Sequence, residues 1–435
     1  TGVQTCALPI YGVITLRAIE GDLSKIEISG HGYLKPDFLR KRLKRHAGKP
    51  FNLLALQRSL QKLRYDQRIK RLRAKFSPGV GQGSGVLDLK LKEHQPFKWT
   101  VHGGNDKPPS VGEKSYGLSM SRENLRGRGD TLRVSYSTTQ GLKDYELEYI
   151  LPQVSGNRFQ LRWSRHSSSL LEEPFDLLDI KSRTSNFSLG FSRQLNWNTA
   201  NESNLELSLH HKNSQSFLLG EPFSLSDGAV DGRARVTSLE FAQNWVKRDL
   251  RRVISSGYSL NKGIDLLGST QDDSGINQDF LFLRTSMDWM ERSEAHKNRL
   301  VLFRLHSQIT GDSLPPVFKY SLGGMRTVRG YRENHILRDN GLLSSLEFRL
   351  PIHPLESSNI TEFQLVPFMD WGRGWDANDP QNEIKSAMSI GLGIRTHYRN
   401  DLSLQIYYGH ALRGKSSGTS LQDKGFHFQF DWHRF

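Results

Sequence analysis

The stretch from Gly323 to Leu350 reads GGMRTVRGYRENHILRDNGLLSSLEFRL, and it decides how the rest of the chain is interpreted. A glycine pair opens it, an Arg-Gly-Tyr-Arg segment follows at 329–332, and an Asp-Asn-Gly turn at 339–341 precedes an alternating strand. The segment is too polar and too rich in glycine for a core element, and too long for a tight hairpin. Loops of this length usually carry function, so the question is which scaffold surrounds it.

The composition of the chain narrows the choice of scaffold. The 435 residues carry a formal net charge of +15, and only 36% of them are hydrophobic. No run approaches the ~20 apolar residues of a membrane-spanning helix, which excludes a helical membrane protein. A transmembrane β-barrel stays possible, because its strands alternate apolar and polar residues. The basic charge is compatible with nucleic acid, anionic lipid or an acidic partner and does not choose among them.

Residues 24–95 predict a small α+β unit with the order β-α-α-β-β. A strand at 25–29 precedes a helix at 36–47, which begins with a proline and ends before a glycine. Asn52 can cap a second helix, and two alternating strands follow it. The polar face of the first helix carries Arg40, Arg42 and Arg45. It lacks interleaved aromatic residues, so we interpret it as a solvated or protein-binding face rather than a nucleic-acid site.

From about residue 96 to residue 435 the helical periodicity disappears, and alternating segments of about ten residues recur between turn residues. Leu132, Val134 and Tyr136, for example, alternate with Arg133 and Ser135. A soluble sandwich would also alternate. An aromatic apolar face, a charged opposite face and strands that continue to the end favour a closed barrel in lipid. Sixteen strands over about 338 residues leave roughly 21 residues for each strand and its connection.

Several short sequence motifs match known functional patterns, but their surroundings in the sequence do not support those functions. Gly409 to Ser416 (GHALRGKS) matches the phosphate-loop pattern, but a poor helix former follows where the mechanism needs a helix N-terminus. Arg128-Gly129-Asp130 precedes a strand and is better interpreted as a turn than as an adhesion tripeptide. The 15 histidines are scattered, the single cysteine is Cys6, and no nucleophile elbow is present. We therefore predict no catalytic residue, no metal site and no cofactor.

A second informative stretch, QLVPFMDWGRGW at 364–375, supplies a partner for the loop. Phe368, Asp370 and Gly372 share one face of an alternating strand, opposite Trp371. If Trp371 meets lipid, Asp370 lies in the lumen, and a loop folded inward could bring Arg329 to it as a bidentate pair. Next to Arg329, Gly330 would permit close backbone approach and Tyr331 could stack on the wall. The alternative is a solvated loop arginine and an unrelated lumen aspartate.

These residues resemble the Omp85 superfamily and, within it, the two-partner secretion transporters of the haemolysin and filamentous-haemagglutinin secretion type. The resemblance rests on the loop motif that contains Val328, Arg329, Gly330 and Tyr331, and on the turn at 339–341 with Glu347. It also rests on the Phe-x-Asp-x-Gly strand at 368–372 and on Arg-Gly-Arg-Gly-Asp at 126–130. The β-α-α-β-β unit is similar to the POTRA domain of that superfamily.

The resemblance implies a sixteen-stranded outer-membrane barrel at 96–435 whose loop at about 322–343 folds inward, with Arg329 held by Asp370. The POTRA domain at 24–95 would lie in the periplasm of a Gram-negative bacterium and receive an unfolded exoprotein by strand addition. Residues 11–23 would be the remnant of a preceding POTRA domain in an N-terminally truncated chain, and residues 1–10 a non-native leader. We expect a monomer that contacts outer-membrane lipid and lipopolysaccharide, exports its partner without ATP, and binds no nucleic acid.

Other functions stay open on the sequence alone. A barrel-assembly factor of the same superfamily is the main alternative, and the RENHILRDNG continuation after Tyr331 favours secretion over it. The POTRA-like unit argues against a passive porin. A soluble basic binding protein would require the 97–435 segment to be soluble without detergent.

Overall fold

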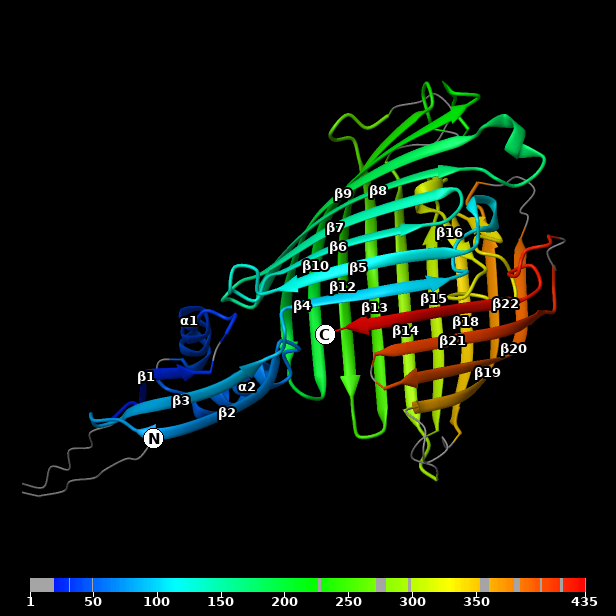
Figure 1. The fold of residues 1–435 in the computed structure, drawn as a ribbon. Helices are drawn as coiled ribbons and strands as arrows, with labels where there is room; N and C mark the ends of the chain where they lie inside the picture. The colour runs from blue at the N-terminus through cyan, green and yellow to red at the C-terminus, as the bar shows by residue number, and fades with distance from the viewer. Residues whose placement is uncertain are drawn as a thin grey trace, which may run out of the picture.

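The computed structural model shows a small α+β unit at one end of a large β-barrel (Figure 1). It describes residues 19–30, 32–48, 50–225, 228–270, 279–295, 299–352, 360–378, 384–399, 401–414 and 418–434. The expected leader and most of the expected remnant at 11–23 lie outside these residues. So does the Lys-Ser end of the GHALRGKS motif.

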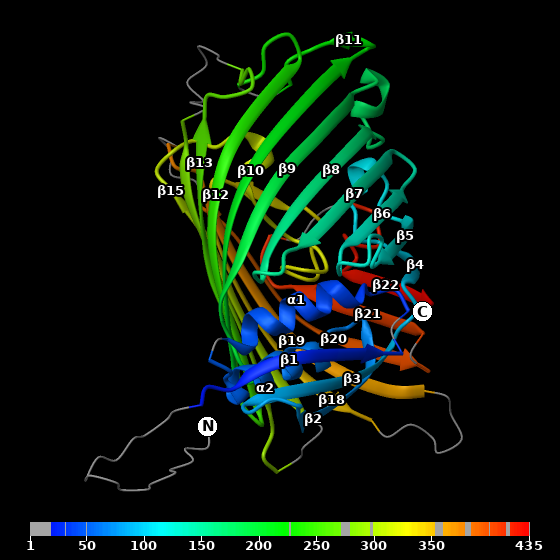
Figure 2. The same ribbon diagram turned by 90° about the vertical axis from the view of Figure 1, so that its left-hand side faces the viewer.

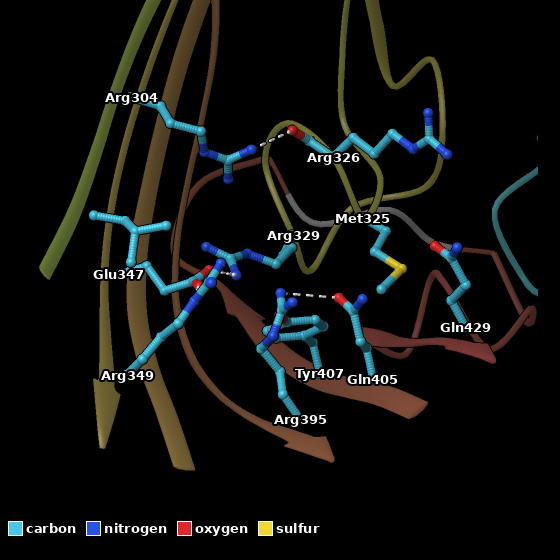
Figure 3. A pocket seen from close by; sticks show the side chains of 11 residues that line it. Arg304, Met325, Arg326, Arg329, Glu347, Arg349, Arg395, Gln405, Tyr407 and Gln429 are labelled. Carbon is cyan, nitrogen blue, oxygen red and sulfur yellow. Dashed lines mark hydrogen bonds and ion pairs between the residues drawn. The ribbon is translucent and has the colours of Figure 1, made fainter. Parts of the chain in front are cut away.

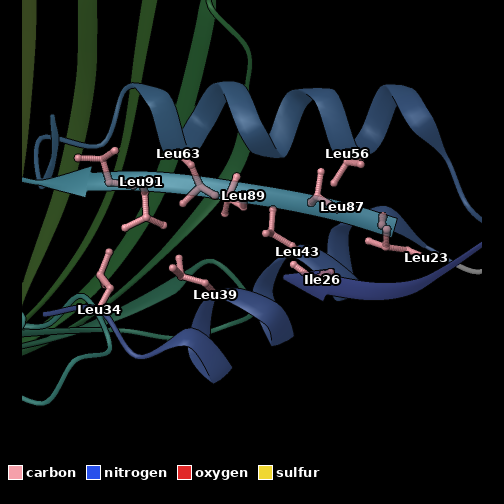
Figure 4. Packing of buried hydrophobic residues seen from close by; sticks show 12 residues of the cluster. Leu23, Ile26, Leu34, Leu39, Leu43, Leu56, Leu63, Leu87, Leu89 and Leu91 are labelled. Carbon is pink, nitrogen blue, oxygen red and sulfur yellow. The ribbon is translucent and has the colours of Figure 1, made fainter. Parts of the chain in front are cut away.

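The α+β unit has the predicted order β-α-α-β-β. Its elements are β1 (Asp22–Ser29), α1 (Pro36–Ala47), α2 (Leu53–Arg64), β2 (Ile69–Pro78) and β3 (Ser84–Glu93). In the three-stranded sheet, β3 is central, parallel to β1 and antiparallel to β2. Leucines from both helices pack on the leucines of β3 and form the core (Figure 4). The Oδ1 atom of Asn52 accepts a hydrogen bond from the Ala55 N–H at 3.0 Å, which is the predicted cap of α2.

Sixteen long antiparallel strands close into the barrel in the described part of the chain, as predicted. The two-residue strand β11 (Glu221–Pro222) adds to the end of β10. The strands are β4 (Phe97–Gly104), β5 (Ser115–Glu123), β6 (Thr131–Thr138), β7 (Leu142–Pro152), β8 (Asn157–Ser169), β9 (Lys181–Trp197), β10 (Asn201–Leu218), β12 (Arg233–Arg248), β13 (Arg252–Ile264), β14 (Leu281–Arg292), β15 (Leu300–Thr310), β18 (Asn340–Pro351), β19 (Ile360–Trp375), β20 (Lys385–Tyr398), β21 (Leu402–Ala411) and β22 (Phe426–Arg434).

The alternation read from the sequence separates the two faces of the barrel wall. Val134, Leu147 and Leu189 point outward and are 38–49% exposed, although they are large apolar side chains. Glu148 and Ser164 are buried on the inner face. An apolar outer surface over a polar interior is the arrangement of a barrel that sits in lipid. Among the described residues, neither helix is long and apolar enough to cross a membrane.

The barrel closes where β22 pairs with β4, and one side chain extends this seam. The last pair of the ladder joins Gln429 to Gly104. Beyond it, the amide of the fully buried Asn105 donates to the Phe426 carbonyl and accepts from the Phe428 N–H, both at 2.8 Å. The Asn105 side chain thereby acts as an additional peptide group and continues the closure by two hydrogen bonds.

The α+β unit contacts the barrel through the turn between β5 and β6. We call this end of the barrel the near mouth and the opposite end the far mouth. The Lys35 N–H donates to the Gly127 carbonyl at 2.8 Å, and the Arg68 guanidinium donates to the Gly129 carbonyl. The buried Asp130 holds the turn by accepting from the Arg126 N–H at 3.0 Å. The Arg-Gly-Asp tripeptide is therefore a docking turn, and the helices lie across the near mouth (Figure 2).

Candidate functional site

The connection from β15 to β18, residues 311–339, folds into the barrel and is called the inward loop below. Its two arms, β16 (Tyr320–Leu322) and β17 (Ile336–Arg338), pair as a short hairpin. Gly323 and Gly324 have φ values of +108° and +96°, which turn the chain at the start of the tip. The tip then packs against the wall in a buried cluster of Leu322, Val328, Tyr331, Ile336, Leu343 and Ala387.

The structure brings Arg329 of the inward loop to Asp370 of β19. The Nε and Nη2 atoms of Arg329 donate to the two Asp370 oxygens at 2.7 and 2.9 Å, a bidentate pair. The Arg329 backbone N–H donates to the same carboxylate at 3.0 Å. Arg329 is 2% exposed and Asp370 is fully buried, so water screens this pair very little. Backbone and side chain together fix the position of the loop tip.

A second strand adds a second carboxylate to this pair. Glu347 on β18 accepts from Nη1 of Arg329 at 2.7 Å. The Ser345 hydroxyl, also on β18, donates to Asp370 at 2.6 Å. Arg349 in turn donates to the other oxygen of Glu347 at 2.7 Å, so two guanidinium groups face two carboxylates. This balance of charge is what allows so many ionised groups to be buried together.

Aromatic rings cover the guanidinium of Arg329. Its Cζ atom lies 3.6 Å from the ring centroid of Phe368 and 4.9 Å from that of Tyr407 on β21. A cation over a ring face is attracted by the ring quadrupole, most strongly where water is excluded. We call Arg329, Ser345, Glu347, Phe368, Asp370 and Tyr407 the Arg329 cluster.

Two glycines let the loop tip touch the wall backbone to backbone. Gly330 has a φ of +93°, and a Cβ on it would lie 2.7 Å from the Gly409 carbonyl oxygen. A Cβ on Gly409 would lie 2.6 Å from the Gly330 nitrogen. At Gly372, a Cβ would lie 2.9 Å from the Val328 side chain. The motif glycines are therefore sites of close approach, which only glycine permits.

Tyr331 holds the loop to β20 by hydrogen bonds to its backbone. The phenol donates to the Met388 carbonyl at 2.8 Å and accepts from the Met388 N–H at 3.1 Å. The sequence analysis expected Tyr331 to stack on the wall. The structure packs its buried ring in one cluster with Leu343 and Ala387 of the wall, and also beside His335 of the same loop, with the ring centroids 4.9 Å apart.

A second ion-pair network joins the inward loop to the far mouth. Arg332 donates to both oxygens of Asp423 at 2.8 Å, and to Glu172 at 2.8 Å. Asp423 lies in the connection before β22, and Glu172 lies in the connection after β8. The Glu333 N–H also donates to Gln422 at 2.8 Å. The loop is thus tied to connections from both sides of the seam between β22 and β4.

The basic residues predicted on α1 do not form one face. Arg40 donates to the Ile26 carbonyl and to Asp37. Arg45 is exposed. Arg42 is half-buried, and burial lowers the pKa of its guanidinium. The charges of Asp66, Arg68 and Arg158 also act on that group.

Several residues of the site were missed by the sequence analysis. His427 and Tyr407 belong to ordinary alternating strands, and Asp423 to a polar connection. The only signal for Tyr407 and His427 was their position on the inward face of β21 and β22, which many other residues share. Among the described residues, no group of three or more His, Cys, Asp and Glu side chains could hold a metal ion.

Comparisons with known proteins give one family and several related structures. The model of the family "Haemolysin secretion/activation protein ShlB/FhaC/HecB" matches residues 83–396. The fold is similar to that of CdiB from Escherichia coli, with a TM-score of 0.78 and 19% identity over 99% of this chain and 80% of that chain. The fold is also similar to that of CdiB from Acinetobacter baumannii, with a TM-score of 0.73 and 18% identity over 98% of this chain and 77% of that chain.

A more distant structure has the same fold. BamA from Haemophilus ducreyi lacking POTRA domains 1–3 gives a TM-score of 0.63 and 15% identity over 95% of this chain and 84% of that chain. At these identities the likeness shows a shared fold. A comparison with curated protein sequences gave no significant match.

Proposed function

The chain belongs to the haemolysin secretion/activation protein family ShlB/FhaC/HecB, and from this membership we propose that it exports one unfolded exoprotein of the haemolysin or adhesin type. The family is one of Omp85-type outer-membrane transporters of two-partner secretion, not of enzymes. Its barrel belongs in the outer membrane of a Gram-negative bacterium. The proposal adds the direction of transport, the unfolded state of the cargo and the independence from ATP.

The observation that carries this proposal is the inward loop held by the Arg329 cluster. The loop tip occupies the lumen and is held by side chains from β18 and β19 and by the backbone of β20. A passive porin conducts small solutes through a water-filled lumen, whereas this lumen holds a buried, charge-balanced plug. A transporter needs one, because a lumen wide enough for a polypeptide must stay closed between transport events.

The α+β unit is proposed to be a periplasmic POTRA domain that receives the cargo. Both β1 and β2 are edge strands, so an extended segment can add to the sheet on either side. The side chains of Lys70, Arg71 and Arg73 on β2 are exposed, and so is Arg45 on α1. A basic edge next to the near mouth would guide an extended chain toward the lumen.

The apolar outer wall is proposed to contact outer-membrane lipid and lipopolysaccharide as a monomer. The alternative function is the assembly or insertion of other barrels. The similarity to BamA supports it, but at a lower TM-score than the similarity to CdiB. The family match favours export.

Co-expression with a candidate exoprotein from a neighbouring gene tests the proposal. We expect release of that exoprotein into the medium. Arg329→Ala should leave an inserted, heat-modifiable barrel and strongly reduce release, because Asp370 and Glu347 lose their shared cation. Arg338→Ala removes the same charge from the same loop outside the Arg329 cluster, and it should export normally. Undiminished release by Arg329→Ala would refute a role for the cluster, and no release by the unmodified chain would refute export.

A further inference from the structure

A cavity of about 240 Å³ lies directly against the tip of the inward loop. Met325, Arg326 and Arg329 contribute one side of it, and β15, β18, β20, β21 and β22 contribute the rest (Figure 3). None of the predicted functions of the loop explains this cavity. Five of its eleven lining residues are arginines, more than of any other residue type (Figure 3).

The cavity lies on the near-mouth side of the loop tip. The β15 strand begins at the near mouth with Leu300, and Leu302 and Arg304 follow directly. The β18 and β20 strands run toward the near mouth, and Arg349 and Arg395 come close to their ends at Pro351 and Tyr398. A polypeptide that enters from the α+β unit would therefore meet this cavity before it meets the loop.

The charge of the lining is strongly positive. Arg304, Arg326, Arg329, Arg349 and Arg395 all line the cavity, whereas Glu347 is its one acidic lining residue among the described residues. Asp370 does not line the cavity but accepts hydrogen bonds from Arg329. Five guanidinium groups against these two carboxylates leave an excess of three positive charges. Arginine stays charged under all physiological conditions, so a lining of this kind attracts anionic groups.

Two of the guanidinium groups use only neutral partners among the described residues. Arg304 donates to the Arg326 carbonyl at 3.1 Å and to the Ser345 hydroxyl at 3.0 Å. Arg395 donates to the Gln405 amide oxygen at 3.1 Å and to the Tyr407 hydroxyl at 3.3 Å. These contacts orient both groups without using a carboxylate as partner. Oriented guanidinium groups of this kind bind carboxylates in a bidentate manner.

We propose that this cavity, the arginine pocket, is a binding subsite for acidic side chains of an extended polypeptide in the lumen. The inference rests on the proposed function, because it takes the exported chain as the ligand. The pocket binds aspartate or glutamate side chains of that chain as it arrives below the inward loop. Arg349 also contacts Glu347, so a bound carboxylate lies next to the Arg329 cluster.

The test measures peptide binding without export. The purified chain in detergent is titrated with a fluorescein-labelled peptide of alternating Glu and Gly, and with a Lys-Gly peptide of equal length, by fluorescence anisotropy. We expect binding of the acidic peptide alone, weakened by salt. The Arg304→Gln/Arg395→Gln double variant should bind it at least about tenfold more weakly. Arg162→Gln is the control, because it removes a lumen charge that is paired with Glu148 on the opposite wall.

Equal binding by the unmodified chain and the double variant overturns the proposal, provided that both remain heat-modifiable. Competition by millimolar inorganic phosphate as strong as that of the unlabelled peptide overturns the assignment to a polypeptide and leaves a simple anion site. The export assay is read separately. The unmodified chain can export nothing while its peptide binding still requires Arg304 and Arg395. That result refutes the proposed export function and supports the proposed binding subsite.

Discussion

The backbone N–H of Gly330 donates to the Nε2 atom of His427 at 3.0 Å, which joins the tip of the inward loop to the last strand of the barrel. His427 is fully buried, and its role as acceptor places its ring proton on Nδ1. Because β22 also forms the seam with β4, this hydrogen bond couples the loop to the closure of the barrel. The loop and the seam should therefore respond together when either is disturbed.

Replacing His427 with phenylalanine tests this coupling. The substitution keeps an aromatic ring and leaves the Gly330 N–H without its acceptor, which should cost about 1–3 kcal/mol of unfolding free energy. Urea unfolding in lipid vesicles measures the loss, and hydrogen exchange of residues 323–338 locates it. His433→Phe is the control on the same face of the same strand. Equal rates of hydrogen exchange in residues 323–338 of the two variants would show that His427 does not hold the inward loop.

The close approach of Gly330 to the wall predicts a steric effect that can be separated from backbone strain. Gly330→Ala and Gly156→Ala both place a side chain at positive φ, +93° and +90°, and both should lose about 1–2 kcal/mol for that reason. Only Gly330 has a neighbour, the Gly409 carbonyl, inside the contact limit, whereas Gly156 faces open space. Limited proteolysis should therefore cut the inward loop in Gly330→Ala alone. Resistance of that loop would contradict the predicted displacement.

The pair of Arg332 and Asp423 predicts a measurable coupling at the far mouth. Asp423 is buried, and both of its oxygens accept from Arg332, so removing Arg332 takes away the cation that faces this carboxylate. A double-mutant cycle of Arg332→Gln and Asp423→Asn should give an interaction energy of about 1–3 kcal/mol. The temperature at which each variant loses its folded, heat-modifiable form measures its stability. Purely additive effects would mean that this pair does not tie the loop to the connection before β22.

The contact of the α+β unit with the near mouth should depend on pH through Lys62. Burial, together with the charges of Arg42 and Arg158, lowers the pKa of Lys62 to about 8 from its ordinary 10.5. Between these two values the free unit binds more protons than the docked one, so docking should strengthen as pH rises from 8 to 10. Hydrogen exchange of α2, corrected for its intrinsic pH dependence, should show increasing protection.

Lys62→Met serves as the control for this pH dependence. The methionine keeps the contact with Trp197, whose ring centroid lies 5.7 Å from the Lys62 ammonium, and it cannot titrate. Protection of α2 in this variant should be high and constant over the same pH range. A rise in protection equal to that of the unmodified chain would assign the effect to another group.

Much of the fold could be predicted from the sequence, because the signals that specify it are local. The period-two alternation around Val134 and Leu147 gives the two faces of the wall. Asn52 and Gly48 give the boundaries of the helices. These patterns depend on neighbours a few residues apart, and the barrel and the β-α-α-β-β order are both confirmed.

The candidate site could be predicted only in part. Arg329 and Asp370 could be identified from the sequence because each lies in a stretch of unusual composition, and the structure brings them into contact. The sequence gave no reason to connect Arg332 with Asp423 or Gly330 with His427, which are 91 and 97 residues apart. The sequence also placed Arg42 on a solvated or protein-binding face, whereas the structure leaves this residue half-buried.

The sequence by itself determined the elements, the face on which each side chain lies and the identity of the loop. Only the tertiary structure decided which inward residues meet. Closing sixteen tilted strands sets the height of each residue relative to strands far along the chain, and this stagger appears in no local pattern. The arginine pocket shows the difference most clearly. Its residues come from the inward loop and five strands, and they become one site only when the barrel closes around the loop.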